Sequence, residues 1–213
     1  MEPAAHPLDA RQAANKITAL DRGLRNGHRG LVIWLTGLSG AGKTTIATEL
    51  ERQLFQQGRH TYLLDGDILR RGLCSDLGFT AEARRENIRR AGELAALFAD
   101  AGVIVIAAFI SPFRADRERV RAMLPPGNFI EVYVNAPLAV CEQRDVKGLY
   151  AKARANQLKE FTGISAPYEA PLQPEIELHT EQFTAQESVR QVIDYLRVLA
   201  EPQAVGASAR TAP

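Results

Sequence analysis

A glycine-rich segment at residues 37–44 has the spacing of a phosphate-binding loop. It reads Gly-Leu-Ser-Gly-Ala-Gly-Lys-Thr, a full match to GxxxxGK[ST], and it stands between an apolar run and a helical pattern. Glycines let the backbone curl so that successive N–H groups face an anion, and the positive end of the next helix adds to the attraction. We expect Lys43 at the β and γ phosphates of ATP and the Thr44 hydroxyl on Mg²⁺. The predicted ATP contacts are Gly37, Leu38, Ser39, Gly40, Ala41, Gly42, Lys43, Thr44 and Thr45.

Two aspartates, Asp65 and Asp67, follow the second apolar run. In open α/β sheets the carboxyl ends of the strands border the ligand crevice, so carboxylates there can take part in chemistry. Asp67 is expected to orient or deprotonate an acceptor hydroxyl, or to hold water on Mg²⁺. For Asp65 a turn, in which the side chain bonds its own backbone, is the stronger alternative. No aspartate follows the third apolar run, so metal support falls to Thr44, water and Asp67.

Six arginines are concentrated between residues 70 and 90, although the chain as a whole has 26 basic and 25 acidic residues. Such a local excess suits an acceptor with phosphate or sulfate oxygens. On a helix that starts near Thr80, Arg84 and Asn87 share one face and can point together at a ligand. For Arg85, Arg89 and Arg90 a solvated helix surface is an equal alternative. The six arginines are Arg70, Arg71, Arg84, Arg85, Arg89 and Arg90.

The segment from Asp145 to Pro174 joins the last two predicted strands and mixes lysines and arginines with glycines and prolines. A connection of that length in a compact domain is usually functional, and we predict that it forms a lid over the site. The alternative is a surface excursion without a role.

Alternating strand and helix patterns predict an α/β fold with a mainly parallel five-stranded sheet, helices on both faces and a lid, the three-layer arrangement of P-loop NTPases. The run Val103–Phe109 has no polar residue and is expected to form the centre of the sheet. Thr184 and Glu187 form a capping box before the last helix, and Ser111 with Pro112 is predicted to begin another. The predicted strands are 31–35, 61–64, 103–109, 129–134 and 175–178.

With 213 residues, 46% of them hydrophobic, the chain fits one domain. We predict an N-terminal extension at 1–28, a kinase domain at 29–200 with its lid at about 145–174, and a disordered tail at 201–213. Cys74 and Cys141 are expected to be buried free thiols. The net charge of +1 and the short apolar runs favour a cytoplasmic protein that binds neither nucleic acid nor membrane.

Several segments together resemble adenylyl-sulfate kinase, over roughly residues 27–200, and are more specific than the phosphate-binding loop alone. These segments are Leu64-Asp65-Gly66-Asp67 with Arg70, Gly72-Leu73, Asp76-Leu77-Gly78-Phe79, Arg84 with Glu86-Asn87-Ile88-Arg89-Arg90, Phe109-Ile110-Ser111-Pro112, Lys147-Gly148-Leu149-Tyr150, Lys159 to Ile164, and Ala166 to Pro171. The resemblance implies transfer from MgATP to the ribose 3′-hydroxyl of adenylyl sulfate (APS), which gives phosphoadenylyl sulfate (PAPS). It also implies a homodimer.

The resemblance implies roles for individual residues as well. It makes Ser111 the family's catalytic serine, assigned as a phosphoserine intermediate, beside Asp67 and Lys43. Phe79 and Phe161 are expected to sandwich the acceptor adenine, which suits aromatic rings physically. The implied acceptor contacts are Asp67, Arg70, Phe79, Arg84, Asn87, Ile110, Ser111, Lys147, Leu149 and Phe161.

Two alternatives stay open at this point. The first is another small-molecule P-loop kinase that acts on a nucleoside monophosphate, shikimate or gluconate. The second is a nucleotide-driven switch, in which the γ-phosphate orders loops and is not passed to an acceptor. A dinucleotide-binding GxGxxG fingerprint does not fit, because the glycines fall at 37, 40 and 42. The sequence also has no guanine-reading Asn-Lys-x-Asp motif.

Overall fold

The computed structural model describes residues 17–200, and these contain a five-stranded sheet in which every neighbouring pair is parallel. The strand order is β2-β3-β1-β4-β5. The predicted α/β fold and all five predicted strands are confirmed, with bounds that shift by one residue at most. The strands are β1 (Leu31–Thr36), β2 (Thr61–Asp65), β3 (Ile104–Ala108), β4 (Phe129–Asn135) and β5 (Ile176–His179).

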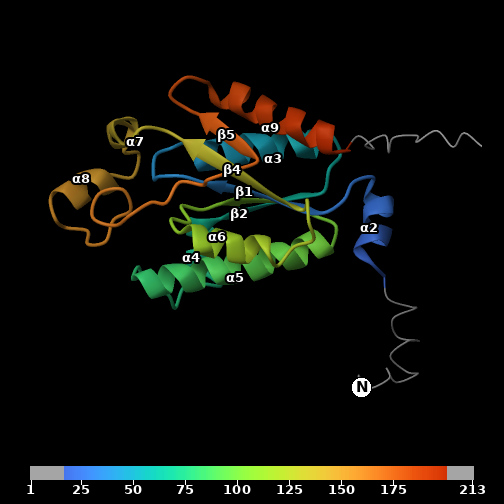
Figure 1. Ribbon diagram of the computed structural model, residues 1–213, viewed down its shortest axis with the longest axis horizontal. Coiled ribbons are helices and arrows are strands. Elements are labelled where there is room, and N and C mark those ends of the chain that lie inside the picture. The colour runs from blue at the N-terminus through green and yellow to red at the C-terminus, as the bar shows by residue number, and fades with distance from the viewer. Residues whose placement is uncertain (1–16, 201–213) are drawn as a thin grey trace, which may run out of the picture.

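Helices cover both faces of the sheet (Figure 1). Helices α3 and α9 lie on one face, and α4, α5 and α6 lie on the other. The short helices α7 and α8 lie beyond the carboxyl end of β4, whereas α2 lies at the opposite end. The helices are α2 (Ala19–Asn26), α3 (Lys43–Gln56), α4 (Gly66–Arg71), α5 (Ala81–Asp100), α6 (Arg114–Arg121), α7 (Leu138–Arg144), α8 (Leu149–Arg154) and α9 (Ala185–Ala200).

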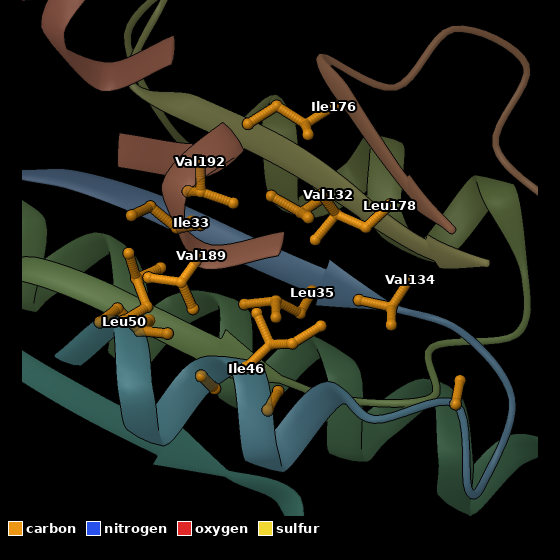
Figure 2. Packing of buried hydrophobic residues seen from close by; sticks show 14 of the residues in the cluster. Ile33, Leu35, Ile46, Leu50, Val132, Val134, Ile176, Leu178, Val189 and Val192 are labelled. Carbon is orange, nitrogen blue, oxygen red and sulfur yellow. The ribbon is translucent and has the colours of Figure 1, made fainter. Parts of the chain in front are cut away.

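The side chains of β1 alternate between two hydrophobic cores, as the period of two in a strand requires. Ile33 and Leu35 pack with Ile46 and Leu50 of α3 and Val192 of α9 (Figure 2). On the other face, the β1 side chains between them pack against α5, α6 and β3. Burial of apolar surface in both cores stabilises the fold, because it is the main favourable contribution to the free energy of folding.

The prediction that Val103–Phe109 forms the centre of the sheet is wrong. β1 occupies the centre, and β3 lies between β1 and β2. The side chains of both β1 and β3 are wholly buried. Strands that are covered on both faces have similar apolar sequences, so composition does not tell which of the two is central.

Helix starts were predicted with mixed success. At α9 the Thr184 hydroxyl accepts from the Glu187 N–H while the Glu187 carboxylate accepts from the Thr184 N–H, so the capping box is confirmed. Helix α5 starts next to Thr80 as predicted, and the Thr80 hydroxyl caps it by accepting from the Ala83 N–H. The predicted cap at Ser111 is wrong, because α6 begins only at Arg114, whose N–H donates to the Glu169 carboxylate at 2.9 Å. A residue distant in sequence therefore satisfies this helix start.

Other predictions concern the thiols, the membrane and the domain limits. Cys74 and Cys141 are both free and buried, as predicted. None of the helices in residues 17–200 is long and apolar enough to cross a membrane. The predicted tail at 201–213 and the first sixteen residues of the predicted N-terminal extension lie outside the described residues.

Candidate active site

The phosphate-binding loop connects β1 to α3 at the carboxyl edge of the sheet. Gly37 and Gly40 have positive φ angles of 151° and 75°. A Cβ atom at Gly37 would lie 2.4 Å from the Val134 carbonyl oxygen, and one at Gly40 would lie 2.9 Å from the Cys141 carbonyl oxygen. These glycines are therefore needed both for the backbone conformation and for the close approach of β4 and α7.

The Lys43 ammonium lies inside the loop that it follows. Its Nζ donates to the carbonyl oxygens of Gly37 at 2.9 Å and Leu38 at 2.7 Å. Burial lowers the pKa of Lys43 to about 8, although Asp65 and Asp67 partly oppose the shift. A bound phosphate would favour the charged ammonium, because an opposite charge offsets the cost of burial.

Asp65 joins the end of β2 to the phosphate-binding loop. Its Oδ1 accepts from the Asp67 N–H at 2.9 Å and so caps α4, as the turn alternative predicted. Its Oδ2 accepts from the Thr44 hydroxyl at 3.2 Å. A carboxylate and a hydroxyl side by side are oxygen ligands of the kind that Mg²⁺ prefers, with phosphates and water completing its shell. This donor set fits the metal that the loop implies.

Asp67 and Lys147 bring the lid segment, residues 145–174, to the end of β2. The Lys147 Nζ donates to the Asp67 carboxylate, and both side chains are more than half exposed. The lid segment includes α8, whose Tyr150 hydroxyl donates to the Ser39 carbonyl oxygen at 2.9 Å. Two lid residues therefore contact the sheet edge and the phosphate-binding loop.

Arg84 of α5 holds another part of the lid segment. Its guanidinium donates to the Thr162 hydroxyl at 2.7 Å, to the Glu160 carbonyl at 2.5 Å and to the Phe79 carbonyl at 2.8 Å. One side chain therefore binds the lid segment and the residue that precedes the α5 cap. A planar guanidinium can satisfy several acceptors in this way, whereas an ammonium cannot do so with the same geometry.

Phe79 and Phe161 lie in different surroundings. Phe79 is 66% exposed, and the Arg70 guanidinium lies 4.5 Å from the centroid of its ring. Phe161 is only 8% exposed and packs edge-to-face on Tyr150, with ring centroids 5.0 Å apart. Phe79 is thus open to a base, whereas stacking of a base on Phe161 requires the lid segment to move.

Asn87 lies one turn after Arg84 on α5, as the predicted shared face requires. It is buried, and its Oδ1 has no hydrogen-bond partner among residues 17–200. A buried amide oxygen without a partner is costly, so a ligand donor at this position would be favoured.

Ser111 is buried in the loop that follows β3, and its backbone has the left-handed φ of 39°. Its hydroxyl accepts from Trp34 Nε1 at 3.1 Å and donates to the Thr36 hydroxyl at 3.0 Å. Thr36 in turn donates to the Ile110 carbonyl at 2.8 Å. Within the described part of the chain, the Ser111 hydroxyl therefore has no acidic or basic side chain among its hydrogen-bond partners.

Tyr168 closes this hydroxyl cluster from the lid segment. Its hydroxyl lies 3.0 Å from that of Thr36, and burial raises the pKa of Tyr168. The phenol therefore stays protonated and can donate to Thr36. A pocket of about 500 Å³ opens beside it, between the phosphate-binding loop and the lid segment. The pocket is lined by Leu38, Gly163, Ile164, Ser165, Ala166, Pro167 and Tyr168.

Residues 29–179 match the family model for adenylylsulphate kinase. The chain belongs to the adenylylsulphate kinase family. The adenylyl-sulfate kinase of Geotalea daltonii is 60% identical over 173 residues, which cover 81% of this chain and 85% of the relative. That of Staphylococcus haemolyticus is 57% identical over 183 residues, which cover 86% and 92%.

Solved structures agree with this membership. The structure of Mycobacterium tuberculosis APS kinase in complex with AMPPNP and APS has a TM-score of 0.76 at 44% identity and covers 79% of this chain and 98% of that one. A gluconokinase from Sinorhizobium meliloti, with a TM-score of 0.52 at 18% identity over 80% of this chain and 93% of that one, shares the fold alone.

In this member of the adenylylsulphate kinase family, the predicted site residues gather at the carboxyl edge of the sheet, apart from three arginines. Arg85 and Arg89 pair with acidic residues of α5 on its exposed surface, in agreement with the alternative of a solvated helix surface. Arg90 is mostly covered and binds Asp76 and the Leu73 carbonyl, so it connects α5 to the segment that precedes it. Ile110 contributes its carbonyl to the Thr36 hydroxyl, and Leu149 packs against the core at the start of α8.

The sequence analysis missed residues that stabilise the adenylylsulphate kinase site without lining it. Arg144 donates to the carbonyls of Gly40 at 3.3 Å and Ala41 at 3.4 Å, and also to the Thr180 carbonyl at 2.7 Å. It thereby braces the phosphate-binding loop from α7. Tyr150 and Tyr168 stand within segments that carried the family resemblance, and that position was the signal for them. Arg144 had no such signal.

Proposed function

We propose that this chain is an ATP-dependent kinase that phosphorylates the 3′-hydroxyl of adenylyl sulfate and gives PAPS and ADP. The observation that carries the proposal is the convergence of a complete phosphate-binding loop with Asp67, Arg84 and the exposed ring of Phe79 at one sheet edge. A nucleotide acceptor needs a surface for its base and cations for its anionic groups, and this edge offers both. Family membership points to the same reaction.

Lys43 and Thr44 act on the donor nucleotide. In the proposal, Lys43 leaves the carbonyls of Gly37 and Leu38 and binds the β and γ phosphates, whose charge offsets the burial of its ammonium. Thr44 and Asp65 supply the protein oxygens for Mg²⁺ and its waters. When bound, the metal would neutralise charge on the phosphate oxygens.

Asp67 acts on the acceptor. The acceptor 3′ oxygen forms a bond to the γ phosphorus, the bond from that phosphorus to the β–γ bridging oxygen breaks, and Asp67 takes the hydroxyl proton. Lys147 holds the Asp67 carboxylate and so orients it towards the site. Products are ADP, PAPS and one proton.

Direct transfer is favoured over a covalent intermediate on Ser111. The Ser111 proton is directed at Thr36, and Thr36 already donates to Ile110, so neither group is a base. We therefore assign Ser111 to the positioning of the acceptor loop, residues 110–112. All contacts of individual residues with the acceptor stay predictions, those of Arg70, Asn87 and Phe161 among them.

The functional assembly is a further part of the proposal. We propose a homodimer. One solved relative, an APS kinase from Thiobacillus denitrificans of which this chain covers 32%, is hexameric. The cytoplasmic location and the use of Mg²⁺ also stay predictions.

ADP release with Mg²⁺ and ATP tests the proposal. The rate would be compared for adenylyl sulfate, AMP, shikimate, gluconate and no acceptor. We expect strong stimulation by adenylyl sulfate alone. Stimulation by another acceptor would contradict the substrate, and no stimulation by any acceptor would favour a nucleotide switch.

A further inference from the structure

Arg117 of α6 is a buried arginine whose three guanidinium nitrogens all have acceptors. It is 1% exposed. Its Nε donates to the Glu131 carboxylate at 2.6 Å, its Nη1 to the Ser111 carbonyl at 2.7 Å and its Nη2 to the Glu169 carbonyl at 2.8 Å. One side chain thus joins β4, the acceptor loop and the lid segment.

The lid segment is attached to the acceptor loop around this arginine. The Glu169 N–H donates to the Pro112 carbonyl at 2.8 Å, and the Glu169 carboxylate accepts from the Arg114 N–H. The Arg114 side chain donates to the Ala170 carbonyl at 2.7 Å. Residues 168–170 therefore form the fixed base of the lid segment, and they lie directly on the acceptor loop.

The backbone conformation of Ser111 has to be stabilised by its neighbours, because residues other than glycine rarely adopt a φ of 39°. Such a conformation persists only where surrounding contacts determine it. The Ser111 hydroxyl is held by Trp34 and Thr36, and its carbonyl is held by Arg117. A charged donor makes the carbonyl bond stronger than a neutral one would.

The charge of Arg117 is balanced within a small network. Glu131 is 4% exposed and also lies 3.5 Å from Arg121, which pairs with Glu175 at 2.5 Å. Arg121 contacts neither the acceptor loop nor the base of the lid segment; its other hydrogen bond goes to the Phe129 carbonyl. The two arginines therefore share the same ion network but differ in what else they touch.

We propose that Arg117 is a positioning residue that holds the acceptor loop and the base of the lid segment at a fixed distance from each other. Adenylyl sulfate would then bind between two segments whose relative position is constant. The proposal rests on the proposed function for the identity of the acceptor. The hydrogen bonds of Arg117 do not reach the phosphate-binding loop, so we expect ATP binding to be independent of Arg117.

The test compares Arg117→Lys with Arg121→Lys. Both retain a positive charge beside Glu131, but only the first loses the two carbonyl contacts. For Arg117→Lys we expect the KM for adenylyl sulfate to rise about 10-fold or more, the range for losing hydrogen bonds from a charged donor, while the KM for ATP stays unchanged. Amide hydrogen exchange at Glu169 and Arg114 should accelerate. Arg121→Lys should lower the melting temperature without either effect.

The proposal is overturned if the KM values for both substrates rise together, or if exchange at Glu169 is the same in the two variants. If the unaltered protein is not stimulated by adenylyl sulfate, the proposed function fails, and hydrogen exchange alone decides the role of Arg117. If Arg117→Lys does not fold, the double variant Arg117→Gln with Glu131→Gln removes both buried charges together. It should show the same accelerated exchange, and unchanged exchange would contradict the proposal.

Discussion

Arg84 and Thr162 connect α5 to the lid segment through a hydrogen bond of 2.7 Å between Nη1 and Oγ1. The two residues are 78 positions apart in the sequence. The same guanidinium holds the Glu160 and Phe79 carbonyls. Arg84, at the start of a long helix, is therefore one of the residues that hold the lid segment at the site, together with Asp67 through Lys147.

Substitution of Arg84 by alanine should weaken acceptor binding. Hydrogen bonds from charged groups contribute about 1.5–3 kcal/mol, so we expect the KM for adenylyl sulfate to rise roughly 10- to 100-fold. Steady-state kinetics would measure this. The matched control is Arg85→Ala, the next residue of the same helix, whose pair with Glu82 at 4.0 Å is at the surface. Equal effects of both substitutions would contradict the assignment.

Asp67→Asn should reduce turnover with little effect on ATP affinity. Loss of a general base typically lowers kcat by about 10²- to 10⁴-fold. Asp76→Asn is the control, because Asp76 is also an ion-paired carboxylate and is 60% exposed, against 61% for Asp67. If Asp67→Asn retained kcat within a factor of two of the control, Asp67 would not be the base.

Binding of a non-hydrolysable ATP analogue should take up protons above pH 8. The pKa of Lys43 is lowered to about 8 by burial, and phosphates should raise it again, so the free ammonium is partly deprotonated in this range while the bound one is charged. Affinity should therefore fall as pH rises above about 8. Calorimetry in buffers of different ionisation enthalpy measures the uptake.

Lys43→Arg provides the control for this titration, because a guanidinium stays charged throughout. Proton uptake should disappear in that variant, even if its affinity for the analogue is lower. Uptake of the same size in Lys43→Arg would assign the proton to another group.

Phe79→Ala should raise the KM for adenylyl sulfate roughly 5- to 100-fold, because stacking of a base on an aromatic ring contributes about 1–3 kcal/mol. Phe55 of α3 is the matched control, since it is 71% exposed and lies outside the candidate site. Product formation at varied acceptor concentration would be measured for both alanine variants. No difference between them would argue that Phe79 does not meet the base.

The strands could be predicted from the sequence because buried parallel strands need continuous apolar runs. Their order could not, since β1 and β3 satisfy the same requirement equally well. Pairing between strands is decided by the crossover helices and by which faces they cover. The expected central position of Val103–Phe109 failed for this reason.

The site divides in a similar way. The phosphate-binding loop was predicted, and so was the turn of Asp65, as an alternative; both are formed by residues close in sequence. The cap at Ser111 was predicted wrongly, because the α6 N-terminus is satisfied by Glu169 from the lid segment. A pattern of neighbouring residues does not indicate that a side chain far along the chain will accept the hydrogen bond of a helix N-terminus.

The sequence by itself determined the phosphate-binding loop, the strand and helix pattern and the family, because each depends on residue types at fixed short spacings. Only the tertiary structure decided that Lys147 meets Asp67, that Arg84 meets Thr162, and that Arg117 joins Ser111 to Glu169. The physical reason is that these partners come from separate elements. Their distance is set by how the helices pack on the sheet, and no spacing along the chain encodes it.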